Sequence, residues 1–146
     1  MTAAIEYRRK PAISNAELDD LYAAAWPAHQ RGQELQPVLQ RSLTWIGAYA
    51  GARLVGFVYG AWDGAQHAFL LDTTVHPDYR HLGVGTRLVR ELAAAAIEAE
   101  PRLEWLHVDS DEALMESFYL PAGFRPTAAG LMSAEDMRGI GEALRP

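Results

Sequence analysis

Residues 73–92, TTVHPDYRHLGVGTRLVREL, place two glycines, Gly83 and Gly85, where a strand would give way to a helix. A helix that begins here presents unpaired backbone N–H groups and the positive end of its dipole. No acidic residue stands between Arg80 and Arg90, so the local sequence leaves that end unneutralised. Glycines let a phosphate approach the backbone. The stretch predicts an anion-binding turn; the alternative is a glycine-rich turn without a ligand.

The helix behind this turn is the clearest element of the sequence. Its apolar residues recur at helical spacing, and Pro101 ends the run. The apolar positions are Val84, Leu88, Leu92, Ala95, Ala96 and Ala99. Two familiar phosphate-binding loops do not fit the turn. A dinucleotide fingerprint would need a third glycine where Leu88 stands, and the nucleoside-triphosphatase loop would need Gly-Lys-Ser/Thr.

Composition predicts one globular domain over residues 1–146, because 49% of the residues are hydrophobic and 22% are charged. The formal net charge of −6 argues against general nucleic-acid binding. With no cysteine, the chain has no disulfide, no thiol nucleophile and no cysteine-ligated metal, and we expect no metal site. The N-terminal MTAAIEYRRKPAIS lacks the apolar run of a signal peptide, so we expect a cytoplasmic protein.

One stretch approaches the length of a membrane span. Residues 44–62, TWIGAYAGARLVGFVYGAW, carry a single charge, Arg53. The glycines, the β-branched and aromatic residues and the central AGAR turn fit a hairpin better, and Arg53 at a bilayer centre would cost a few kcal/mol. We therefore expect two strands, 44–49 and 54–62, and no membrane association.

The remaining elements alternate between strands and helices. Ser14 and Glu17 form a capping box before a helix whose apolar face runs through Leu18, Leu21, Tyr22 and Ala25. A shorter helix is expected over residues 32–43, interrupted at Pro37, and another over 111–123. Strands are expected at 4–10, 66–76 and 103–109, with one or two final strands in 124–134. The fold class is therefore α/β, a mixed central β-sheet flanked by about four helices.

Two segments resemble the GNAT superfamily of acyl-CoA-dependent N-acyltransferases. RHLGVG, residues 80–85, is similar to its Arg/Gln-x-x-Gly-x-Gly/Ala signature, and SFYLPAGFRPT, residues 117–127, resembles a later motif in which a tyrosine precedes a Gly-Phe pair. The order of elements resembles the GNAT core over nearly the whole chain. One departure is that Glu112 and Met115 stand where the family often has asparagine and alanine.

The resemblance implies a binding site for acetyl-CoA. In that family the loop after the fourth strand grips the pyrophosphate, and backbone groups at the end of that strand pair with the pantetheine. The residues implied for the pantetheine are Thr73, Thr74 and Val75. Those implied for the pyrophosphate are Arg80, His81, Leu82, Gly83, Val84, Gly85 and Thr86.

Direct acyl transfer to an amine needs a neutral amine, a polarised carbonyl and a proton for the departing sulfur. Tyr119, four residues before Gly123, is the implied general acid; the alternative is a tyrosine that only packs its ring. The general base is open between Asp72, which could instead be paired within its loop, His107, which could instead be structural, and bulk water. If Trp105, His107 and Asp109 share one strand face, the histidine could take a proton.

The acceptor would bind near the end of the first helix, where Trp26 could line the pocket or belong to the core, and where His29 follows. The function implied is transfer of an acetyl group from acetyl-CoA to a primary amine of a small molecule or peptide. The alternative is a non-catalytic acyl-CoA-binding regulatory module. Members of the superfamily are often dimers, so a homodimer is among the implied partners.

Overall fold

The computed structural model describes residues 4–146, which fall into two compact units, Met1–Ser110 and Asp111–Pro146. We refer to them as the first and second unit and describe each separately. The first unit contains all the strands found in the described residues, β1 (Ile5–Arg9), β2 (Ser42–Ala50), β3 (Arg53–Trp62), β4 (His67–Val75) and β5 (Trp105–His107). Its helices are α1 (Asn15–Ala25), α2 (Gln36–Arg41), the single 3-10 turn η1 (Pro77–Tyr79) and α3 (Val84–Ala99).

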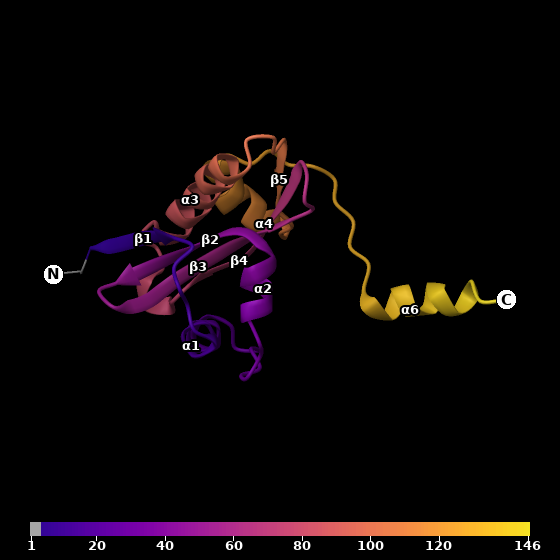
Figure 1. Ribbon diagram of the computed structural model, residues 1–146, viewed down its shortest axis with the longest axis horizontal. Coiled ribbons are helices and arrows are strands. Elements are labelled where there is room, and N and C mark those ends of the chain that lie inside the picture. The colour runs from indigo at the N-terminus through magenta and orange to yellow at the C-terminus, as the bar shows by residue number, and fades with distance from the viewer. Residues whose placement is uncertain (1–3) are drawn as a thin grey trace. The chain divides into compact units, whose positions relative to one another are not determined.

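The five strands form one mixed sheet in the order β1-β2-β3-β4-β5. The first four are antiparallel neighbours, whereas β4 and β5 run parallel, joined through α3. Figure 1 shows α3 on one side of the sheet and α1 on the other. The mixed sheet with flanking helices that the sequence predicts is confirmed, and so is the hairpin of residues 44–62. No helix in residues 4–146 is long and apolar enough to cross a bilayer.

The capping box of α1 forms as predicted. The Ser14 hydroxyl accepts the Glu17 N–H at 3.1 Å, and the Glu17 carboxylate accepts the Ser14 N–H at 2.9 Å. Together the two bonds satisfy donors that a helix N-terminus otherwise leaves unpaired. The helix then buries Leu18, Leu21 and Tyr22 against the sheet, so its start is set by neighbouring residues and its orientation by packing.

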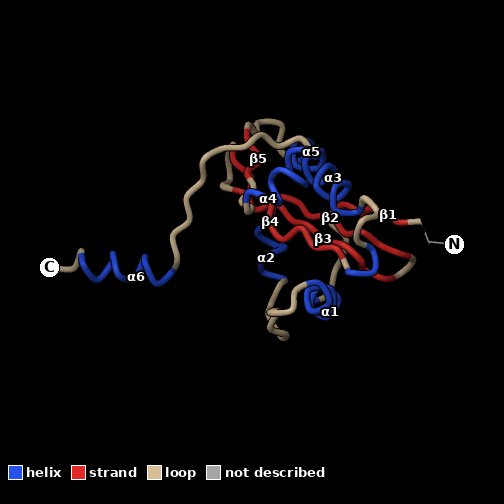
Figure 2. Tube along the Cα trace, turned by 180° about the vertical axis from the view of Figure 1, so that it is seen from behind, coloured by secondary structure: helices blue, strands red, loops and turns tan. Residues whose placement is uncertain are grey.

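The opposite face of the sheet receives α3 (Figure 2). Leu88 and Leu92 of α3 are fully buried there. A Cβ atom on Gly56 would lie 2.9 Å from the Leu88 side chain, so the glycine lets helix and strand approach closely. This packing fixes the N-terminus of α3 against the C-terminal end of β4.

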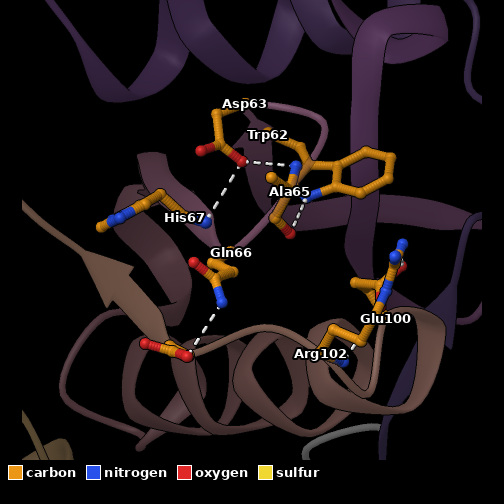
Figure 3. Close-up of polar contacts among 8 residues, drawn as sticks. Trp62, Asp63, Ala65, Gln66, His67, Glu100 and Arg102 are labelled. Carbon is orange, nitrogen blue, oxygen red and sulfur yellow. Dashed lines mark hydrogen bonds and ion pairs between the residues drawn. The ribbon is translucent and has the colours of Figure 1, made fainter.

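The turn between β3 and β4 is closed by side-chain contacts (Figure 3). The Asp63 carboxylate accepts the N–H groups of Ala65, at 2.7 Å, and His67, at 3.1 Å. The Gln66 carbonyl accepts the N–H groups of Glu104 and Trp105, at 2.9 and 3.1 Å. The turn therefore sets the start of β4 and the register of β5 beside it.

The second unit is helical, and one sequence prediction for it is wrong. Residues 112–122 form α4 (Glu112–Leu114), the π-helical η2 (Met115–Tyr119) and α5 (Leu120–Ala122) in succession, and α6 spans Ala134–Ala143. The final strands expected in 124–134 are absent from this described segment. Ser133 instead caps α6, its hydroxyl accepting the Asp136 N–H at 3.1 Å, and Glu135 and Asp136 favour a helix start. With 112–122 counted as one helix, the described residues form five helices besides η1, where about four were expected.

Candidate functional site

The end of β4 departs from regular strand geometry. Phe57 pairs with Thr74 and Tyr59 with Leu71, so two residues of β4 face one of β3, and Asp72 has a φ of +57°. This is a β-bulge whose first residue, Asp72, is in the left-handed region, a conformation that costs about 1–3 kcal/mol for a residue other than glycine. The Thr74 hydroxyl donates to the Asp72 carbonyl at 2.8 Å and stabilises the bulge.

The Asp72 side chain contacts α1, which packs on the sheet. The Tyr22 hydroxyl donates to Asp72 Oδ2 at 3.2 Å. Burial raises the pKa of the Asp72 carboxyl, and the bond from Tyr22 offsets part of that rise. Burial, with the nearby Asp72 charge, also raises the pKa of Tyr59 to about 12. A half-buried carboxylate with a raised pKa is suited to accept a proton near neutral pH.

Aromatic rings surround this carboxylate on the α1 side. The Tyr22 ring lies 4.5 Å from that of Trp26 and 6.2 Å from that of Phe57. Trp26 is partly buried and packs against the core cluster that contains Tyr22. The structure therefore places Trp26 beside the Tyr22 ring, at the edge of the hydrophobic core.

His29 is tied down within the first unit. Its Nε2 donates to Asp19 Oδ1 at 2.5 Å, and its side chain is only 5% exposed. The other oxygen of Asp19 accepts the Gly32 N–H at 3.0 Å. The His29–Asp19 pair and the Gly32 contact therefore anchor residues 26–32 to α1.

The turn between β4 and α3 has the features of an anion site. Gly83 is the N-cap of α3 with a φ of +80°; the cap makes no side-chain hydrogen bond, and the first turn contains no acidic residue. A Cβ atom on Gly83 would meet nothing within 4 Å. Buried Val84 anchors the helix start behind it. The first N–H groups of α3 are therefore held in place behind an open approach.

The cationic side chains of the turn are less available than the sequence suggests. The Arg80 guanidinium donates to the Ala25 carbonyl at 3.1 Å, which ties the turn to the end of α1. Arg87 pairs with Glu91 at 2.7 Å and lies over the Tyr7 ring. His81 has a φ of +62° and Leu82 is exposed, so both shape the turn's outer rim. Backbone N–H groups are thus the principal anion donors here.

His107 lies at the open edge of the sheet. Its Nε2 is 2.8 Å from Nδ1 of His67, and its ring stacks on Phe69 with centroids 4.7 Å apart. The strand ends at His107, so Asp109 lies outside β5, and the shared face expected for these two residues is wrong. The parallel register of β4 and β5 supplies His67 as the partner instead.

Tyr119 belongs to the second unit, where it ends η2. Its ring makes edge contacts with those of Phe118 and Phe124, and its carbonyl accepts the Phe124 N–H at 3.1 Å. Gly123 has a φ of +122° and terminates the helix, so the Gly-Phe pair folds back onto the tyrosine.

Tyr22 and Tyr59 are the neighbours of Asp72 that sequence reasoning missed. In the sequence, Tyr22 is recognised only as a core residue on the apolar face of α1. Its hydroxyl hydrogen bond joins it to a residue 50 positions away. Nothing in the local sequence reports such a pairing.

The chain is similar to known proteins both in sequence and in fold. Residues 11–124 match the family model described as the acetyltransferase (GNAT) family. An uncharacterized N-acetyltransferase, ycf52 of Pyropia yezoensis, is 32% identical over 75 residues, 51% of this chain and 41% of that protein. The chain thus matches less than half the length of this curated relative.

Two solved structures share the fold. A putative acetyltransferase from Deinococcus radiodurans has a TM-score of 0.74 at 22% identity, covering 93% of this chain and 92% of that one. AAC(6')-Iy, solved with the bisubstrate analogue CoA-S-monomethyl-acetylneamine, has a TM-score of 0.71 at 16% identity, covering 90% and 97%. With the family match spanning the strand, the glycine turn and the tyrosine motif, the chain belongs to the GNAT acetyltransferase family.

Proposed function

We propose that this protein transfers an acetyl group from acetyl-CoA to a primary amine of a small molecule or peptide. The observation that carries the proposal is the exposed N-terminus of α3 behind Gly83, without a side-chain cap or acidic residue in its first turn. Family membership supports the reading. AAC(6')-Iy, a protein of this fold, was solved with an analogue that joins CoA to an acetylated amine.

The turn fits a pyrophosphate. Open space where a Gly83 side chain would stand lets phosphate oxygens reach the amides of residues 82–86. Arg80 and His81 would shape the entrance. Thr73, Thr74 and Val75 would pair with the pantetheine through their backbone groups, since the Thr74 hydroxyl is already bound within the bulge. These residues together would form the acetyl-CoA site.

The proposed chemistry assigns one role to each residue. Asp72 would take the proton that an acceptor ammonium must lose, since its carboxyl is half-buried with a raised pKa. The backbone N–H of Val75 would polarise the thioester carbonyl. Tyr119 would donate a proton to the leaving thiolate, because a phenol and a thiol have close ordinary pKa values. His107 and water are the alternative proton acceptors.

The proposal takes residues 1–146 as one functional domain that works in the cytoplasm, and the resemblance to the family adds a homodimer to the implied partners. Trp26 would line the acceptor pocket beside Tyr22, and His29 would support it from behind. The net charge of −6 favours a cationic acceptor.

The proposal predicts release of free CoA when acetyl-CoA and a suitable amine are both present. A thiol assay against polyamines, aminoglycosides, amino acids and peptides measures this directly, with acetyl-CoA alone as the control. Acceptor-dependent release supports the enzyme. Tight CoA binding with no release across the panel would instead identify a non-catalytic acyl-CoA-binding module.

Thr74→Val is expected to leave CoA affinity almost unchanged, because the Thr74 side chain is 1% exposed and its hydroxyl is bound to the Asp72 carbonyl. The variant should lose about 1 kcal/mol of unfolding free energy with that hydrogen bond. Calorimetry measures the affinity and denaturant titration the stability. A large loss of affinity at unchanged fold would replace backbone pairing with a hydroxyl contact.

A further inference from the structure

Asp72 is a half-buried carboxylate without a cationic partner in the described part of the chain. Its carboxylate accepts a hydrogen bond from the Tyr22 phenol at Oδ2, and its charge helps to raise the pKa of the Tyr59 phenol. Thr74 binds its carbonyl and not its carboxylate. Buried charges in proteins are ordinarily paired, so this carboxylate has the character of a receptor for a cation.

Tyr22 is built to hold that carboxylate in one orientation. The side chain is 4% exposed and belongs to the core cluster of α1 and the sheet. Its ring is confined by Trp26 and Phe57 and by an edge contact with His29, at 5.6 Å. Burial raises the pKa of the Tyr22 phenol well above its ordinary value, so the hydroxyl stays protonated and remains a donor.

We propose that Tyr22 is the positioning residue for Asp72: it binds Oδ2 and turns Oδ1 toward the ammonium of the acceptor. This inference rests on the proposed acetyltransferase function. The ammonium N–H bond breaks, an O–H bond forms at Oδ1, and a neutral amine faces a neutral carboxyl. Two opposite charges become two neutral groups, so the half-buried site gains no net charge during the step. The bulge contributes by placing Asp72 where α1 can reach it.

The groups acting on Asp72 predict the direction of its titration. Tyr22 from α1 lowers its pKa by donating to the charged form, whereas burial raises it. Tyr59 from β3 is neutral over the working pH range. The His29 and Asp19 pair stands behind the Tyr22 ring. Loss of the Tyr22 hydroxyl therefore raises the pKa of Asp72, and the deprotonated base is present only at higher pH.

Tyr22→Phe tests the assignment, with Tyr49→Phe as the matched control. Tyr49 has the same 4% exposure and belongs to the same core cluster, whereas the hydrogen bond to the Asp72 carboxylate comes from Tyr22. The Asp72 carboxyl is followed by carbon-13 NMR titration, its resonance identified by its loss in Asp72→Asn. The expected result is a rise of about one pH unit in Tyr22→Phe and none in Tyr49→Phe.

The acidic limb of the kcat/KM profile should move by the same amount in Tyr22→Phe. An unchanged carboxyl titration in folded Tyr22→Phe, or an equal shift in Tyr49→Phe, would overturn the positioning role. A shifted titration with an unshifted rate profile would overturn the role of Asp72 as proton acceptor. If the parent protein acetylates no acceptor, the proposed function fails. The NMR titration still decides whether the Tyr22 hydroxyl lowers the pKa of the Asp72 carboxyl.

Discussion

Gly83→Val is expected to abolish CoA binding, raising the dissociation constant at least about 100-fold. Valine would fill the open space through which a pyrophosphate reaches the N-terminal amides of α3. Losing two charge-assisted hydrogen bonds of about 1.5–3 kcal/mol each accounts for a change of that size. Calorimetric titration with CoA measures the effect.

Backbone strain needs its own control, because Gly83 has a φ of +80°, which valine adopts poorly. Gly64 offers a close match: its φ is +85°, and a Cβ there also meets nothing within 4 Å. Gly64→Val should lose similar stability and keep its affinity for CoA. A folded Gly83→Val protein that binds CoA as tightly as the parent would show that the pyrophosphate binds elsewhere.

Tyr119→Phe is expected to lower kcat by roughly 100-fold or more, about 2.7 kcal/mol at the barrier, with the KM for acetyl-CoA nearly unchanged. The variant keeps the ring and therefore its contacts with Phe118 and Phe124. Its rate loss would report proton donation and not unfolding. Steady-state and single-turnover rates, with an acceptor found by the panel, provide the measurement.

The comparison requires conditions in which chemistry, and not product release, limits turnover. Tyr49→Phe is again the control for replacing a buried tyrosine by phenylalanine. Parental turnover in folded Tyr119→Phe under these conditions would exclude Tyr119 as the acid and leave solvent as the proton source.

Features governed by neighbouring residues were predictable from the sequence. Ser14 and Glu17 are three residues apart and form the capping box on their own. The apolar spacing of α3 and the glycine turn before it are likewise local, and both appear where expected. The family motifs that imply the acetyl-CoA site lie in this same class of short signals.

The features that were missed depend on tertiary contacts or on competing local preferences. The bulge at Asp72 reflects a register shift between β3 and β4, and the sequence of one strand alone does not specify its register with another. The contacts of Asp72 with Tyr22 and of His107 with His67 join distant segments. The sequence of residues 124–134 predicts strands, yet Ser133 and the acidic residues after it begin a helix.

The central claim is that the N-terminus of α3 and the end of β4 bind acyl-CoA. Titrating the nitrogen-15-labelled protein with CoA and following its backbone amide resonances tests this claim at every residue at once. The account predicts that the largest shifts occur at the amides of residues 82–86 and 73–75. Saturating CoA that leaves these amides unmoved while shifting others would contradict it.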